Sequence, residues 1–96
     1  PPPVGTGVEE NSGLNEVVIY PNPSNGIINI SIKNANFKEL QITIVDILGS
    51  VIYNNLEKGI TTDYTKQINL ENVPEGLYYI KLNTGSEVRT KKLIIQ

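Results

Sequence analysis

The sequence predicts an all-β domain, a seven-stranded antiparallel immunoglobulin-like β-sandwich. The 96 residues include 14 Ile and 8 Val but a single Ala, and branched side chains suit strands whereas Ala favours helices. Several segments alternate between apolar and polar residues, which is the pattern of a strand with one buried face. Clusters of Asn, Gly, Ser and Pro interrupt these segments about every 8–12 residues, the spacing of short strands in a sandwich.

The first strand is expected at residues 17–20 and the second at residues 27–33. Pro21 ends the first strand and marks it as an edge strand, because proline cannot donate a hydrogen bond to a sheet. The following segment NPSNG is typical of a turn, in which Gly26 can adopt a positive φ. In the second strand every other residue is an isoleucine, which is the clearest half-buried pattern in the chain.

The third and fourth strands are expected at residues 40–46 and 50–54, joined by a tight hairpin. The connecting segment is DILG. The Asp46 carboxylate can accept backbone N–H groups within such a turn, and Gly49 can adopt the left-handed conformation that closes it. The polar residues 54–64 are expected to form a longer loop.

The last three strands are expected at residues 66–70, 77–83 and 87–95. The segment NVPEG separates the first two, and proline suits the second position of such a turn. The segment NTGS separates the last two and is typical of a hairpin. Tyr78 is expected to face inward with its hydroxyl hydrogen-bonded, as in a tyrosine corner.

The alternation within four of these strands also predicts the core. The side chains expected between two sheets are Ile30, Ile32, Ile42, Ile44, Ile68, Leu70, Tyr78, Ile80 and Leu82. Residues 1–15 open with three prolines, contain three glycines and show no periodicity. We therefore interpret residues 1–15 as a flexible linker or a remnant of cloning, and residues 16–96 as the domain.

Composition excludes most catalytic and metal-binding classes. The chain has no Cys and no His, and its net charge is −2. Disulfide scaffolds, zinc sites and Cys or His nucleophile pairs are thereby excluded, and no basic patch indicates nucleic acid. No paired carboxylates, phosphate-binding loop or calcium loop is present, and no apolar run is long enough to span a membrane. We expect no enzymatic activity, no catalytic residue, no metal and no cofactor.

The last expected strand is the least regular. It combines cationic with aliphatic residues: Arg89, Lys91, Lys92, Leu93, Ile94 and Ile95. Strict alternation fails here, because Leu93 and Ile95 share the phase of Lys91. A twisted edge strand with a bulge explains this pattern, and a surface made for a partner explains it equally well.

Four segments in this order resemble the C-terminal sorting domain of the type IX secretion system, the Por secretion tail family of Bacteroidota. They are YPNPSNG at residues 20–26, IVDILG at 44–49, GLYYIKL at 76–82 and KKLII at 91–95. The positions that carry the resemblance are Tyr20, Pro21, Asn22, Pro23, Gly26, Asp46, Gly49, Gly76 and Tyr78. The likeness covers residues 17–96.

The resemblance implies a secretion signal rather than a catalyst. Members follow an N-terminal cargo domain in the same precursor, which passes through the periplasm. The type IX translocon and an outer-membrane shuttle protein recognise the tail, and a sortase-like surface protease usually removes it. The cargo then stays at the outer-membrane surface or is secreted. We expect recognition at Arg89 and at residues 91–95, where an edge strand near the chain end is accessible.

An alternative is a non-catalytic immunoglobulin-like or fibronectin-like binding or spacer module of an extracellular enzyme or adhesin. The same fold serves both functions, so the fold does not discriminate between them. A sugar-binding sandwich usually exposes aromatic rings for stacking. This chain has no Trp and one Phe, which makes a poor platform for that purpose.

Overall fold

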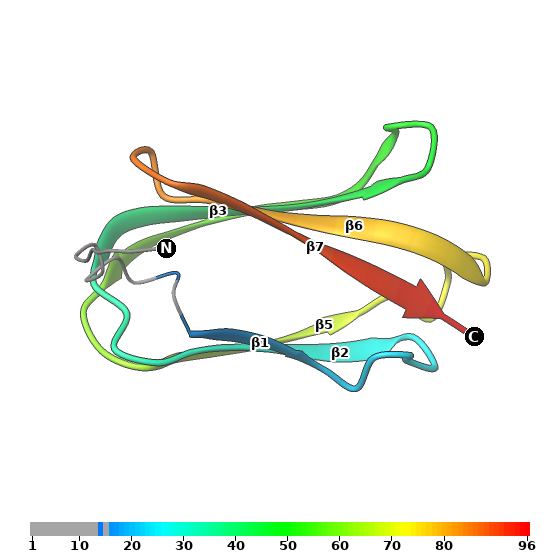
Figure 1. Ribbon diagram of the computed structural model, residues 1–96, viewed down its shortest axis with the longest axis horizontal. Helices are drawn as coiled ribbons and strands as arrows, with labels where there is room; N and C mark the ends of the chain where they lie inside the picture. The colour runs from blue at the N-terminus through cyan, green and yellow to red at the C-terminus, as the bar shows by residue number, and fades with distance from the viewer. Residues whose placement is uncertain (1–13, 15) are drawn as a thin grey trace, which may run out of the picture.

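The computed structural model describes Leu14 and residues 16–96 as seven antiparallel strands in two layers (Figure 1). The prediction of an all-β sandwich is confirmed. The strands are β1 (Val17–Tyr20), β2 (Ile27–Ile32), β3 (Phe37–Asp46), β4 (Val51–Ile60), β5 (Tyr64–Asn69), β6 (Gly76–Asn83) and β7 (Val88–Ile95). Since the described residues fold into strands and turns, they supply no apolar helix of membrane-spanning length.

One sheet has the strand order β1-β2-β5 and the other β4-β3-β6-β7. In the constant-type immunoglobulin arrangement, the fourth strand joins the sheet of the first, second and fifth. Here β4 pairs with β3 instead. Strands β1 and β7 are both edge strands, and they lie on the same side of the sandwich, where β7 passes in front of its sheet in Figure 1.

The core consists of alternate residues from both sheets. All nine side chains predicted to be internal are buried. The other buried apolar side chains are Leu14, Val17, Ile28, Ala35, Leu40, Ile60, Leu93 and Ile95. Leu14 is fully buried, although it lies in the segment that we assigned to a linker. The packed domain therefore begins no later than Leu14, whereas residues 1–13 and Asn15 lie outside the described part of the chain.

Strand β4 continues to Ile60, so the prediction of a loop over residues 54–64 is wrong for its first half. The segment is polar because β4 is the edge strand of its sheet, and its side chains find polar partners there. Asn54 accepts hydrogen bonds from Gln41 at 3.1 Å and from Thr43 at 3.2 Å. Polarity alone therefore does not separate an edge strand from a loop.

A polar cluster closes the sandwich between the edge strands β4 and β5. The Glu57 carboxylate accepts a hydrogen bond from Asn55 at 2.7 Å and pairs with the Lys66 ammonium at 3.2 Å. Burial alone would raise the pKa of Glu57, but its contacts with Lys66, Tyr64 and Asn55 hold this pKa below the ordinary 4.5. Burial, together with the Glu57 charge, raises the pKa of Tyr64. The buried Tyr64 hydroxyl makes no hydrogen bond of regular geometry to a described residue.

Candidate functional site

Strand β7 pairs with β6 in one unbroken register, from Ile95 opposite Gly76 to Val88 opposite Asn83. The explanation by a β-bulge is therefore wrong. Leu93 and Ile95 are buried, and Lys91 lies on the same inner face. Lys91 is only half-buried at this position, on the edge strand of its sheet.

The burial of Leu93 and Ile95 also corrects one expectation about recognition. Their exposed fractions are 0% and 4%, so a partner cannot take them into pockets without opening the core. Ile94 points outward and is 38% exposed. The aliphatic side chain that a partner can reach near the end of β7 is therefore Ile94, which follows the exposed Lys92 on the same face.

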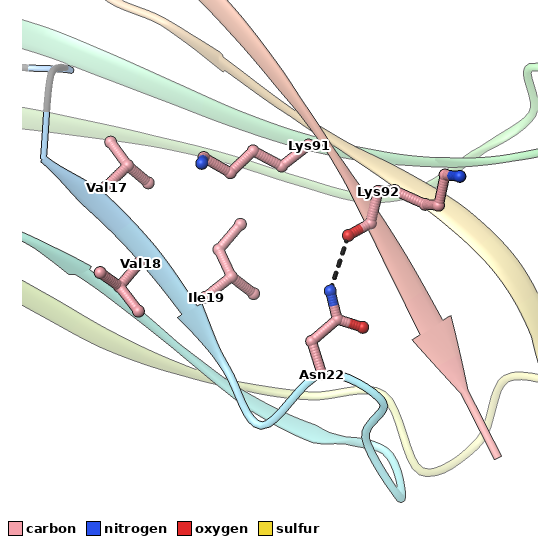
Figure 2. Close-up of a pocket in the computed structure, with 6 residues that line it drawn as sticks. All are labelled: Val17, Val18, Ile19, Asn22, Lys91 and Lys92. Atoms are coloured by element: carbon pink, nitrogen blue, oxygen red, sulfur yellow. Dashed lines mark hydrogen bonds between the residues drawn. The ribbon is translucent and has the colours of Figure 1, made fainter.

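The turn after β1 is hydrogen-bonded to the outer edge of β7. The Asn22 amide donates to the Lys92 carbonyl at 2.9 Å, as Figure 2 shows. The Asn22 side-chain oxygen accepts from the Ile94 backbone N–H at 3.1 Å. A single amide side chain thus replaces two backbone groups of a neighbouring strand. It ties the first sheet to the last strand of the second sheet.

Ser24 continues this connection with its backbone. Its N–H donates to the Ile94 carbonyl at 2.8 Å, and its carbonyl accepts from the Gln96 N–H at 2.8 Å, in a parallel bridge. The Ser24 hydroxyl is buried, accepts from the Gly26 N–H at 3.0 Å and donates to the Ile27 carbonyl at 2.9 Å. The last residues of the chain are therefore held from both sides, by β6 and by this turn.

Sequence reasoning did not foresee this contact. The two partners, Asn22 and Lys92, are 70 positions apart, and no periodicity relates them. We expected a partner to bind along the edge of β7, where it could add a strand to the sheet. Asn22 and Ser24 already occupy this edge from Lys92 onward, so a shorter part of it is left for a partner. In an antiparallel strand alternate residues point their backbone groups outward. Val88 and Thr90 therefore keep outward N–H and C=O groups with no partner among the described residues.

A groove of about 500 Å³ lies between β1 and β7 (Figure 2). Its lining consists of Val17, Val18, Ile19, Asn22, Lys91 and Lys92. The Lys91 side chain extends across the opening toward β1, whereas the Lys92 ammonium points away from it. Neither ammonium forms an ion pair with a described residue, while Arg89 pairs with Glu87 at 3.2 Å. The groove therefore joins an apolar wall to unpaired positive charge.

The hairpin between β3 and β4 has the expected turn. The Asp46 carboxylate accepts the N–H groups of Leu48 and Ser50, each at 2.9 Å, and Gly49 has a φ of +88°. The Tyr78 hydroxyl donates to the Pro74 carbonyl at 2.5 Å, which confirms the expected inward tyrosine. Both local predictions held because their partners lie within a few residues.

The four sequence motifs meet at one end of the sandwich. Ser24 bridges to Ile95, which lies opposite Gly76, and Asp46 lies opposite Tyr78. This is the right-hand end of Figure 1, where the C-terminus also lies. The four motif segments, which are spread from residue 20 to residue 95 in the sequence, thus meet in one region of the fold. We call this region the motif end. The described residues include no group of three or more carboxylates able to hold a metal ion.

The fold by itself does not define a function, so the motif residues gathered at one end of this small β-sandwich are the feature that distinguishes it. The family model described as the secretion system C-terminal sorting domain matches residues 18–96. The chain belongs to this family, whose members are sorting signals of type IX secretion and specify export to the cell surface or the medium. No curated protein sequence matches the chain significantly.

Proposed function

We propose that this domain directs a folded cargo, attached on its N-terminal side, from the periplasm across the outer membrane by the type IX system. A sortase-like surface protease then separates the domain from its cargo. The observation that carries the proposal is the family match over residues 18–96. The gathering of all four motifs at one end of the sandwich supports it, because a partner can recognise one compact region on a folded domain.

Recognition by the translocon and its shuttle protein is proposed at β7. Arg89, Lys91 and Lys92 supply positive charge, and Ile94 supplies exposed apolar surface. The outward backbone groups of Val88 and Thr90 are available for an added strand. Leu93 and Ile95 contribute by packing, which holds this strand in place.

Export of a foreign protein tests the proposed function. We expect that all 96 residues, fused behind a folded reporter with a Sec signal, carry it to the surface or medium of a bacterium with a type IX system. The measurement is the reporter fraction outside the periplasm, compared with a host that lacks the translocon. If the reporter stays in the periplasm with its tail folded and the machinery intact, the domain is not a sufficient signal.

Removal of two charges tests the proposed recognition site. The double variant Lys91→Ala, Lys92→Ala should nearly retain its melting temperature, because neither lysine forms an ion pair with a described residue, Lys92 is exposed and Lys91 is only half-buried. Export of the same reporter should fall roughly tenfold, which corresponds to about 1.4 kcal/mol of lost binding. The matched control Lys38→Ala, Lys58→Ala removes the same charge from exposed positions on β3 and β4. Equal export by both stable double variants would refute a role for the β7 lysines.

A further inference from the structure

The hairpin between β3 and β4 exposes two large aliphatic side chains at its tip. Ile47 is 67% exposed and Leu48 is 86% exposed, whereas turn positions ordinarily carry Gly, Pro, Asn, Asp or Ser. The hairpin extends away from the sandwich at the motif end, as the green loop in Figure 1 shows. Its tip contributes nothing to the core, so packing does not explain these two residues.

The backbone of this turn is held in one conformation. The Gly49 N–H donates to the Asp46 carbonyl at 3.0 Å, and the Asp46 N–H donates to the Ser50 carbonyl at 3.0 Å. The two bonds to the Asp46 carboxylate complete the turn. Because the backbone of the turn is already ordered, little conformational entropy is lost when a partner binds these side chains. The aliphatic tip is thus presented rigidly rather than on a loose loop.

The exposed apolar surface continues from the tip along the outer face of the sheet. We call it the hairpin patch, which consists of Ile47, Leu48, Val51, Leu77 and Ile94. Val51 is 59% exposed, and Leu77 lies opposite Ile94 in the sheet register. A hollow of about 370 Å³ lies against Ile47, Leu48 and Leu77. Apolar patches of this kind on small soluble domains usually mark interaction sites.

Two carboxylates border this hollow and indicate which partner fits. Asp46 and Glu75 both line it, and Glu75 is exposed and forms no ion pair with a described residue. An anionic lipid surface would be repelled by these charges. A symmetric contact with a second copy would bring like charges together. A protein surface that carries an aliphatic side chain beside a Lys or Arg fits this site. The aliphatic side chain would fill the hollow, and the cation would pair with the carboxylates at its border.

We propose that the hairpin patch is a second docking site, which binds a basic-aliphatic protein surface of the export machinery. This inference rests on the proposed function, and it concerns a surface on the outer face of the sheet, away from the groove between β1 and β7. Its continuity with Ile94 places it next to the proposed recognition strand. The two sites together would let one partner contact the edge and the outer face of the motif end.

The reporter fusion tests the patch. The variant Ile47→Ser, Leu48→Ser should fold normally, since both side chains are exposed, and its export should fall about tenfold, as expected when two apolar anchors of an interface are lost. The control Leu56→Ser changes a side chain of β4 that is 47% exposed and belongs to neither proposed site, and its export should not change. Retention of the unaltered fusion would contradict the proposed function itself. Export of the unaltered and Ile47→Ser, Leu48→Ser fusions to the same extent would overturn only the patch.

Charge reversal and vesicles distinguish the class of partner. Glu75→Lys should reduce export severalfold, whereas Glu39→Lys, the same change at an exposed position of β3, should not. Purified domain should not sediment with vesicles of phosphatidylethanolamine and phosphatidylglycerol. If the domain binds vesicles and Ile47→Ser, Leu48→Ser abolishes this binding, the proposal of a protein partner is refuted and the patch binds the membrane. A dimer in sedimentation velocity that the same variant dissociates would overturn it in favour of a second copy.

Discussion

Leu93→Ala should lower the free energy of unfolding by about 2–5 kcal/mol, the usual cost of truncating a fully buried leucine. Leu93 is 0% exposed and lies on β7 opposite Tyr78, so the lost methyl groups leave a cavity between the sheets. Ile94→Ala, one position further on, should cost less than about 1 kcal/mol, because Ile94 lies on the outer face. The two variants shorten adjacent aliphatic residues on opposite faces of one strand.

Denaturant unfolding of the purified domain measures both effects. The reporter fusion adds a second readout, in which Ile94→Ala should reduce export while the domain stays folded. Leu93→Ala should reduce export only to the extent that it unfolds the domain. Similar losses of stability in the two variants would show that the faces of β7 are assigned wrongly. That result would also remove the packing role given to Leu93.

The sequence predicts this inner and outer division well wherever one face of a strand is buried. Alternation in β2, β3 and β6 identifies core residues because successive side chains of a strand point to opposite faces. The Asp46 turn and the Tyr78 hydroxyl are predictable for a different reason. Their hydrogen bonds link residues close in the chain, so residue type and spacing suffice.

Other features depend on packing that a single sequence does not display. The position of β4 beside β3 is one, since pairing between strands is non-local and residues 54–60 are too polar to indicate a strand. The inward phase of Lys91 is another, because only the fold shows the groove beside β1 into which its side chain extends. The bonds from Asn22 to β7 are a third. Both segments, residues 20–26 and 91–95, are recognisable as motifs in the sequence, but only the fold shows that they are in contact.

Gly26→Ala should destabilise the domain more than Gly49→Ala. Both glycines have positive φ, +121° and +88°, and a residue with a side chain at such a φ costs of order 1–3 kcal/mol. At Gly49 a new Cβ would meet open space. At Gly26 it would lie 3.1 Å from the Glu71 Cα and 3.3 Å from the Glu71 backbone nitrogen, which are main-chain atoms and move only with the segment that follows β5. The neighbouring Leu70 N–H also donates to the Gly26 carbonyl at 2.6 Å.

Gly26→Ala should also loosen the end of β7, to which Gly26 is linked through Ser24. The Gly26 N–H is bonded to the Ser24 hydroxyl, and Ser24 in turn holds Ile94 and Gln96. Amide hydrogen exchange at Ile94 and Gln96 should therefore become faster in Gly26→Ala and stay unchanged in Gly49→Ala. Export of the reporter should fall further for Gly26→Ala than its loss of stability explains, because the proposed recognition strand loses its support. Unchanged protection at both amides would show that the turn and the last strand are not coupled.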